Sequence, residues 1–293
     1  MSQTNNNLSN ISANLAKNKL LTDCYRHMQS DDLVLPTIPD VCFKIRHAIN
    51  ADNSSVSSIA RVVQVDPSIT ARLIQISNSS LYAGRKKIES CPEALTRLGL
   101  KAAQDIITAF AIKSVFNAKS PVIRHKMEEL WDHSGYIAAI SAVLAHKIPG
   151  FDPDRAMLAG LVHDIGIVPI LTYADNHPDI IDHPKYLVET VKKLRADIGV
   201  QIIRQWAFPD DFENVVINAE NWFRNDSNPS SYSDIVMISQ LYSFIGKVDI
   251  KKIPKIDDLP AYKKLAGHLD ADDAINILDA AKDEIEHIQQ MLA

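Results

Sequence analysis

The sequence predicts an all-α protein built from many helices. Apolar residues recur at helical spacing in one segment after another, and no segment alternates apolar and polar residues for long enough to require a strand. Glycine is scarce, at 9 residues, and several prolines stand where helices begin or end. With 293 residues, of which 46% are hydrophobic, the chain can form one large core or two modest ones. We therefore expect a multi-helical fold with two helical subdomains.

The N-terminal region predicts one helix followed by an extended segment. Apolar residues recur at helical spacing over 8–28, after a run of asparagines, so residues 1–32 are assigned to an N-terminal helix. LPTIP at 35–39 predicts extended backbone, because proline disfavours helical conformation in the residue before it. A helix follows this segment.

The next part of the chain contains a strong helix-start signal. Asp66 can cap free backbone amides, and Pro67 needs no hydrogen-bond partner at the first helical position. Further along, Gly99 is suited to end a short helix. Residues 100–116 then predict a long, mostly apolar helix, which neighbouring elements must cover nearly all round.

A polar stretch that ends in proline, NAKSP at 117–121, predicts the seam between the two subdomains. Residues 33–119 are assigned to an N-terminal helical subdomain. Residues 120–293 are assigned to a second helical domain that includes a C-terminal helix. We expect the first subdomain to pack on the second.

The second domain is expected to begin with a long helix over 122–147. The Asp-Pro start signal recurs at Asp152 and Pro153, and the helix that follows is expected to run to Gly166. Further helices are expected at 184–206, 210–222, 232–247 and 272–292.

Charge and cysteine content narrow the class of protein. The net charge is −5, from 31 basic and 36 acidic residues, so no strong overall field favours nucleic acid or an anionic membrane. The three cysteines are widely spaced and form no CxxC pair, which argues against a disulfide framework or a zinc ribbon. We expect a cytoplasmic protein with no membrane association.

The stretch AGLVHDIGIVPI, at 159–170, places His163 and Asp164 side by side in an apolar run. Buried polar side chains need partners, so either a metal ion or a hydrogen-bond network must satisfy this pair. A divalent metal requires three or more ligands here. His133 is the leading third ligand, because its long helix should pack against the helix of His163.

Seven motifs, in the same order as in a known family, extend this pattern. They are LPTIP, DPSIT, ISNSSLY, the segment that ends ALTRLG, LWDHS, AGLVHDIG and IGVQIIRQWAFP. HDIG after a helix that carries LWDHS resembles the HD superfamily of metal-dependent phosphohydrolases. The wider pattern, over about 33–247, resembles its HDOD branch, a regulatory relative of the HD-GYP phosphodiesterases. The resemblance implies an N-terminal helical subdomain beside an HD-like helical domain.

The resemblance also implies a metal site that this sequence matches only in part. His133, His163 and Asp164 match the first three ligand positions of an active HD site. Arg195 stands where relatives often have His, AENW at 219–222 replaces the usual His-His, and Gln240 stands where the distant Asp is expected. A cation and a neutral amide are poor substitutes for metal ligands. No GYP motif follows, so the resemblance does not support cyclic-dinucleotide hydrolysis.

These departures predict how the site is closed instead. We expect Asp164 to pair with Arg195, and Gln240 to bond to one of the two histidines. Asp234 lies nearly two helical turns from Gln240, about 9 Å along the axis, so it should miss the site.

Two functions follow from the resemblance. We favour a catalytically inactive HDOD-type signalling module of a bacterial pathway, with no cofactor, that binds a signalling protein or a small signalling ligand. The alternative is an HD-type phosphohydrolase that acts on a phosphomonoester, nucleotide or cyclic nucleotide; it would need a divalent metal such as Fe, Mn, Ni or Zn. The amphipathic C-terminal helix suggests either packing on the domain or a homodimer. The basic loop GRKK, at 84–87, together with Lys101, is a weaker candidate for anion binding.

Overall fold

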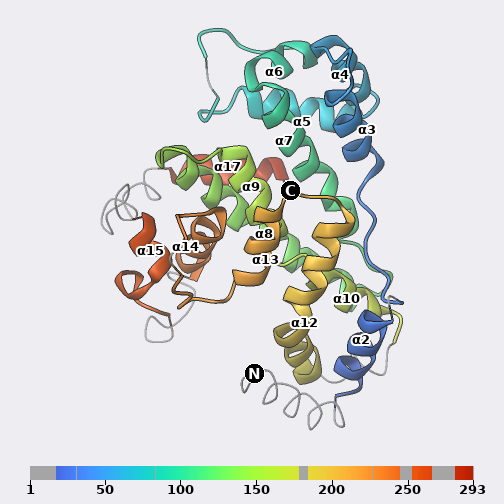
Figure 1. Cartoon of the computed structure of the whole chain (residues 1–293). Helices are drawn as coiled ribbons and strands as arrows, with labels where there is room; N and C mark the ends of the chain where they lie inside the picture. The colour runs from blue at the N-terminus through green and yellow to red at the C-terminus, as the bar shows by residue number, and fades with distance from the viewer. Residues whose placement is uncertain are drawn as a thin grey trace.

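The all-α expectation is confirmed by the computed structural model, which describes residues 18–30, 32–82, 84–177, 184–226, 228–244, 253–265 and 281–292. Within these ranges the chain forms helices and connecting loops, with no strand (Figure 1). The α-helices are α2 (Lys19–Gln29), α3 (Asp40–Ile49), α4 (Val56–Val63), α5 (Pro67–Ser77), α6 (Cys91–Leu98), α7 (Leu100–Ile112), α8 (Pro121–Lys147), α9 (Pro153–Val162), α10 (Ile167–Asp175), α12 (Pro184–Gln205), α13 (Asp210–Asn218), α14 (Tyr232–Phe244), α15 (Pro260–Leu265) and α17 (Lys282–Leu292), with 3-10 turns at Lys113–Val115 and Ile256–Asp258.

The two Asp-Pro start signals are confirmed. The Asp66 carboxylate accepts hydrogen bonds from the amides of Ser68 and Ile69, at 2.9 and 3.1 Å, and caps α5. Asp152 caps α9 in the same way. The first-turn amides of a helix have no partner within the helix, so each cap stabilises a start that the sequence marks.

The helices form two connected groups (Figure 1). Helices α3 to α6 lie together at one end of the molecule, and α7 leads from them to the centre, where it packs against α9. Helices α8 and α9 pack along each other there, and α14 covers both. The buried apolar residues of both groups belong to one continuous cluster, and the subdomain boundary at 119/120 stays a prediction.

The central helices α8 and α9 approach each other closely at Gly160. A β-carbon at this position would lie 2.8 Å from Cα of Ala138 and 2.9 Å from its backbone nitrogen. Such distances are too short for a side chain, so glycine permits this approach. The contact brings α8, which carries His133, next to the end of α9, where His163 follows.

A second close approach joins α12 to the segment between α9 and α10. A β-carbon on Gly166 would lie 1.9 Å from the carbonyl oxygen of Arg195 and 2.7 Å from the amide nitrogen of Gly199. Gly166 has a φ of −65°, which any residue can adopt, so the glycine is needed for space rather than for conformation. This contact places Arg195 beside the His163–Asp164 pair.

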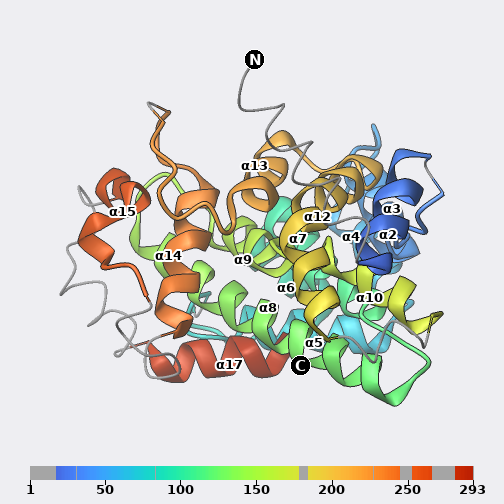
Figure 2. The same ribbon diagram turned by 90° about the horizontal axis from the view of Figure 1, so that it is seen from below.

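The terminal helices pack on this framework. Helix α2 lies against α12, where the Asn18 side chain donates to the carbonyl of Tyr186 at 3.0 Å. Helix α17 lies along α8 and touches α5 (Figure 2). Arg72 of α5 donates to the Met291 carbonyl at 2.6 Å. The expected segments 8–17 and 272–280 lie outside the described residues. A homodimer through the C-terminal helix stays a prediction.

The most apolar stretch of the chain is a core segment of the fold. By length and composition Pro153–Asp175 would suffice to cross a membrane, but 83% of its most apolar 18-residue stretch is buried inside the protein. The stretch is also interrupted by the turn that carries His163 and Asp164.

Candidate functional site

His163 and Asp164 lie in a turn between two helices. Helix α9 ends at Val162, residues 163–166 form the turn, and α10 begins at Ile167. The expectation that one helix runs to Gly166 is therefore wrong by four residues, and α10 was not anticipated. Pro169 explains the break, because in a continuous helix its ring would clash with the carbonyl of Ile165. Pro169 was the signal in the sequence that could have revealed it.

The turn brings together the three side chains that the sequence singles out. His133 extends from α8 and is half-buried, whereas His163 is fully buried. His133, His163 and Asp164 each offer one ligand atom, and these atoms lie within 4.8 Å of one another. The three residues therefore form a group that could hold a metal ion by donor type and spacing.

The predicted pair between Asp164 and Arg195 is confirmed. Arg195 Nη1 donates to Asp164 Oδ1 at 2.5 Å, and both side chains are largely buried, at 5% and 12% exposed. The second nitrogen of the same guanidinium, Nη2, lies 3.3 Å from Oε2 of Glu220. Glu220 belongs to AENW, which the sequence indicated only as a loss of histidines. An acidic residue there, opposite an arginine, was the signal for its role.

Electrostatics keep Asp164 ionised. Burial by itself would raise the pKa of this carboxyl, but His163, whose Nε2 lies 3.3 Å from Oδ2, and the charges of Arg195 and His133 outweigh it. The pKa of Asp164 therefore lies well below its usual range. Asp164 acts as a carboxylate, which can accept hydrogen bonds or bind a cation but cannot donate a proton.

The ring of His163 has one satisfied nitrogen and one that lacks a hydrogen-bond partner. Nδ1 lies 2.7 Å from the carbonyl oxygen of Gly160, which can only accept, so Nδ1 carries the hydrogen. Nε2 is buried without a hydrogen-bond partner, 3.3 Å from Asp164 Oδ2. The Nε2 edge of the ring therefore faces the Asp164 carboxylate.

A catalytic metal fits this group poorly even so. The donor set offers two imidazoles and one carboxylate, but the carboxylate already binds a guanidinium that is part of α12. A metal ion at Asp164 would meet that fixed positive charge. No further Asp, Glu, His or Cys of the described residues joins the group.

The two candidate side chains on α14 are used elsewhere. Gln240 is buried, and its amide nitrogen donates to the carbonyl of Ala219 at 2.6 Å. The expected bond from Gln240 to a histidine stays a prediction. Asp234 accepts from Arg224 and, at 2.8 Å, from the amide of Ser231, so it misses the metal group as expected.

The basic loop and its neighbours are partly tied to the fold. Lys86 pairs with Glu93 at 2.7 Å, the Asn78 side chain bonds to the backbone of Ile88, and Tyr82 donates to Asp154. Anion binding at GRKK stays a prediction.

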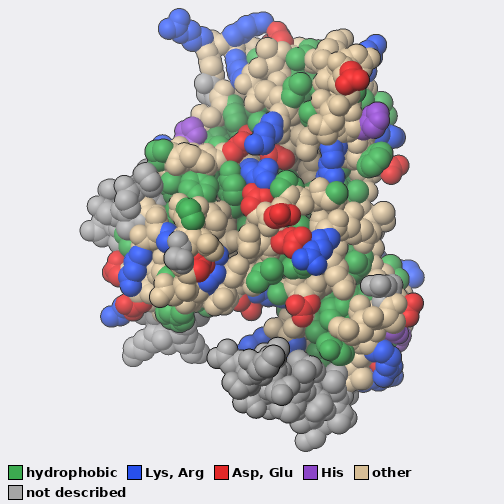
Figure 3. Space-filling view, in the orientation of Figure 1, with side chains coloured by type: hydrophobic (Ala, Val, Ile, Leu, Met, Phe, Trp, Pro, Cys, Tyr) green, Lys and Arg blue, Asp and Glu red, His purple; other side chains and the backbone are tan. Residues whose placement is uncertain are grey.

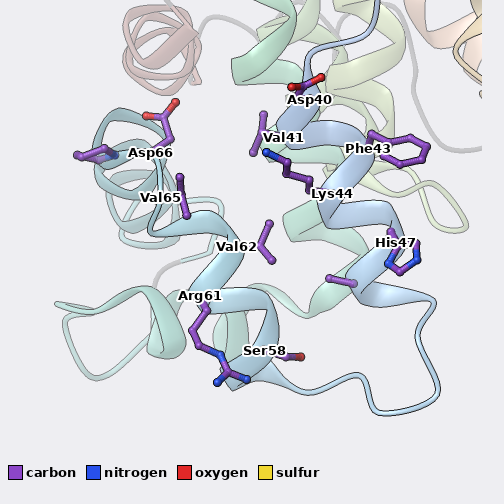
Figure 4. Close-up of a pocket in the computed structure, with 12 residues that line it drawn as sticks. Asp40, Val41, Phe43, Lys44, His47, Ser58, Arg61, Val62, Val65 and Asp66 are labelled. Atoms are coloured by element: carbon purple, nitrogen blue, oxygen red, sulfur yellow. The ribbon is translucent and has the colours of Figure 1, made fainter.

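A separate apolar groove of about 940 Å³ lies between α3 and α4 (Figure 4). Val41, Val62 and Val65 line the hollow, and Asp40 lies near one end, with Arg61 at the other. Val65 is 80% exposed, so the groove presents apolar surface to solvent.

The fold and the His-Asp turn define an HD-type helical protein, and comparison with known proteins identifies the family. The family model of the HDOD domain matches residues 35–222, well over half of the chain. The protein therefore belongs to the HDOD domain family.

Two solved structures and one curated relative are similar to this chain. A "Putative metal-dependent phosphohydrolase" from Shewanella amazonensis SB2B is 26% identical, with a TM-score of 0.82, over 94% of this chain and 98% of that one. A "Putative signal transduction protein" from Marinobacter aquaeolei VT8 is 19% identical, with a TM-score of 0.59, over 97% and 68%. An uncharacterized protein of Treponema pallidum (strain Nichols) is 21% identical over 62% of this chain, which spans only 37% of that protein's length.

Proposed function

We propose that this protein is a catalytically inactive HDOD signalling module. One observation carries the proposal: the Arg195 guanidinium binds Asp164, the carboxylate that a metal ion would need, and also reaches Glu220. A cation held in the site by the chain itself balances the buried carboxylate without a metal. The kinship of the fold with a protein described as a signal transduction protein is consistent with this role.

The experiment that tests the proposal is the metal content of the purified protein. Elemental mass spectrometry is applied to the wild type and to His163→Ala, before and after incubation with excess Fe, Mn, Ni or Zn. We expect substoichiometric metal in both proteins and no phosphatase activity toward phosphomonoesters or nucleotides. Near-stoichiometric metal in the wild type that is lost in His163→Ala would overturn the proposal.

A phosphohydrolase is the second candidate function, and one observation favours it. The unpartnered Nε2 of His163 points toward Asp164, in a group of three side chains with metal-ligand chemistry. The structural kinship with a protein described as a metal-dependent phosphohydrolase is consistent with it. The metal measurement above decides between the two functions.

A signalling module acts through a binding surface, and we propose that the α3–α4 groove is that surface. Its occupant would be an amphipathic helix of a partner protein. The valines offer a hollow for an apolar stripe, and the exposed Phe43 extends the apolar surface. Arg61 favours acidic residues at one end of such a helix, whereas Asp40 favours basic residues at the other.

The groove is tested with a synthetic helical peptide that carries a leucine stripe, glutamates at one end and lysines at the other. Fluorescence anisotropy should show saturable binding to the wild type and to Val188→Asp, a matched change at an exposed valine on α12. Val62→Asp, inside the groove, should weaken binding about tenfold or more. Equal binding to both variants, or none to the wild type, would refute this surface.

A further inference from the structure

A second cavity, of about 330 Å³, lies between the two groups of helices. Its lining includes Arg46 on α3, Lys101 and Asp105 on α7, Arg155 on α9 and Phe208 in the loop after α12. Figure 3 shows basic and acidic side chains close together at the junction between the α3–α7 end and the rest of the molecule. The cavity has the size of a small-molecule site and lies apart from the His163–Asp164 turn.

The cavity contains a buried carboxylate that is not fully satisfied. Asp105 is 7% exposed, and its Oδ2 atom has no hydrogen-bond partner. A buried acceptor without a donor costs free energy, so such atoms are rare in native proteins. Burial raises the pKa of Asp105 to about 6, against the charges of Arg155 and Lys101, while Asp152 and Asp211 add to the rise. The site therefore lacks a hydrogen-bond donor for Asp105.

Arg155, the cation with the strongest electrostatic effect on Asp105, is bound to another carboxylate. Arg155 donates two hydrogen bonds to Asp211, at 2.7 and 2.6 Å, and its guanidinium lies over the rings of Phe212 and Tyr232. Turning toward Asp105 would break this bidentate pair. Arg155 attracts the Asp105 carboxylate electrostatically but donates no hydrogen bond to its Oδ2 atom.

Two other cations of the lining have no carboxylate partner within the described part of the chain. Arg46 donates through Nη1 to the carbonyls of Trp206 and Ala207, at 2.8 and 3.3 Å, which leaves its other nitrogens for a further acceptor. Lys101 is exposed and, among the described residues, makes no ion pair. The cavity thus offers one carboxylate that needs a donor and two cations that can bind an anion.

The wall of the cavity also contains an unusual backbone conformation. Ala207 has a φ of +50°, and within the described ranges it is the sole non-glycine residue with positive φ. This region is unfavourable for an alanine, and the hydrogen bonds from Arg46 hold the loop there. The loop is kept in a shape that presents Phe208 to the cavity at a cost in local strain.

We propose that this cavity binds a small zwitterionic molecule, with its protonated amine on Asp105 and its carboxylate or phosphate group on Arg46 and Lys101. A metal ion would meet three positive side chains, and a simple anion would face the Asp105 carboxylate. A molecule that carries both charges satisfies both halves of the site. The proposal goes beyond the signalling role and is independent of whether the His163–Asp164 turn binds metal.

The test compares molecules that share one half of the charge pattern. Phosphoethanolamine and L-glutamate carry both an amine and an anionic group, ethyl phosphate only the anion, and ethanolamine only the amine. At the same millimolar concentration, at least one of the first two should raise the melting temperature of the wild type in a saturable way. The two single-charge molecules should raise it much less. No shift with either zwitterion, or an equal shift with ethyl phosphate, would overturn the proposal.

Variants locate the binding. Asp105→Asn keeps the shape of the side chain and should weaken binding about tenfold, since it removes one charge-assisted hydrogen bond. Lys101→Ala, at an exposed position, should also weaken it, whereas Lys192→Ala, at an exposed position on α12, should leave it unchanged. If all three variants bind as the wild type does, the zwitterion binds elsewhere and the assignment is wrong.

Discussion

Arg195 contacts Asp164 through a hydrogen bond of 2.5 Å, although one residue lies in α12 and the other in the turn after α9, 31 positions apart. The other side of the guanidinium reaches Glu220, so one arginine joins three segments of the chain. Because the pair is largely buried, its loss should have two measurable consequences, in stability and in metal binding.

Removal of Arg195 should destabilise the protein and open the site to metal. Arg195→Ala leaves a buried carboxylate without its partner, which typically costs about 3 kcal/mol. The same change removes the positive charge that opposes a metal ion at the three donors. We expect a lower melting temperature for Arg195→Ala, and Mn²⁺ or Zn²⁺ should raise it again, whereas neither ion should shift the wild type.

A double variant controls for general damage. Arg195→Ala with Asp164→Asn removes the unpaired charge, so part of the stability should return and the response to metal should vanish. A metal response that persists without Asp164 would show that the ion binds elsewhere on the protein.

A methyl group at Gly166 should separate α12 from the turn. The added β-carbon of Gly166→Ala would collide with the backbone of Arg195 and Gly199, so one element must move, at a cost of about 3 kcal/mol. The matched control is Gly135→Ala in α8, whose β-carbon would have no neighbour closer than 4.0 Å. Gly135→Ala should be neutral or stabilising, because alanine favours helix. Urea unfolding measures both, and equal effects would contradict the close-contact argument.

The pH dependence of stability should carry the signature of Asp105. Its pKa rises on folding from 3.8 to about 6, so the folded state binds a proton that the unfolded state has released. Stability from this group is therefore highest below pH 3.8 and falls as the pH rises to about 6. Asp105→Asn should remove this fall and make the protein more stable than the wild type at neutral pH, by on the order of 3 kcal/mol.

The pH profile of Asp105→Asn must be compared with that of the wild type, because the pKa of a second carboxyl also rises on folding. Burial also raises the pKa of Asp154, to about 7, so the wild type and Asp105→Asn share that part of the pH profile. Urea unfolding on both sides of pH 6 gives the difference. A constant difference between the two proteins at all pH values would contradict the shifted pKa of Asp105.

A hydrogen bond from the Trp206 side chain should hold the extended segment before α3. Trp206 Nε1 donates to the carbonyl of Pro36 at 2.8 Å, and the ring is 1% exposed. Trp206→Phe preserves most of the apolar contact but leaves the carbonyl unpaired, so we expect a loss of about 1 kcal/mol. Hydrogen exchange should also quicken in residues 33–39 while α17 is unaffected; unchanged exchange at 33–39 would contradict this anchor.

The sequence predicts well what depends on local chemistry. The Asp-Pro caps and the apolar periodicity specify most helices, because capping and burial act within a few residues. The sequence could also predict the group formed by His133, His163 and Asp164, since the short connection between α8 and α9 requires these helices to pack together. The pairing of Arg195 with Asp164 followed from opposite charges at positions that resemble one metal site.

The remaining features depend on contacts distant in sequence. Glu220 approaches Arg195 only because α12 and α13 pack side by side, and no local pattern encodes that approach. The N-terminal end of α8 also depends on a contact distant in sequence. The Asp175 carboxylate accepts hydrogen bonds from the amides of Lys119 and Ser120, more than 50 residues away. The break at Val162 was local and was missed because the apolar run continues through Pro169.

The guanidinium beside Asp164 differs from a bound ion in one further respect. A metal exchanges with its surroundings, so a metal-dependent site changes shape when chelators or starvation lower the free ion concentration. Arg195 is part of the chain and cannot exchange, and its guanidinium contacts both Asp164 and Glu220. Under the proposed function, the junction of α9, α10 and α12 should therefore keep one conformation regardless of the cell's supply of iron, manganese or zinc.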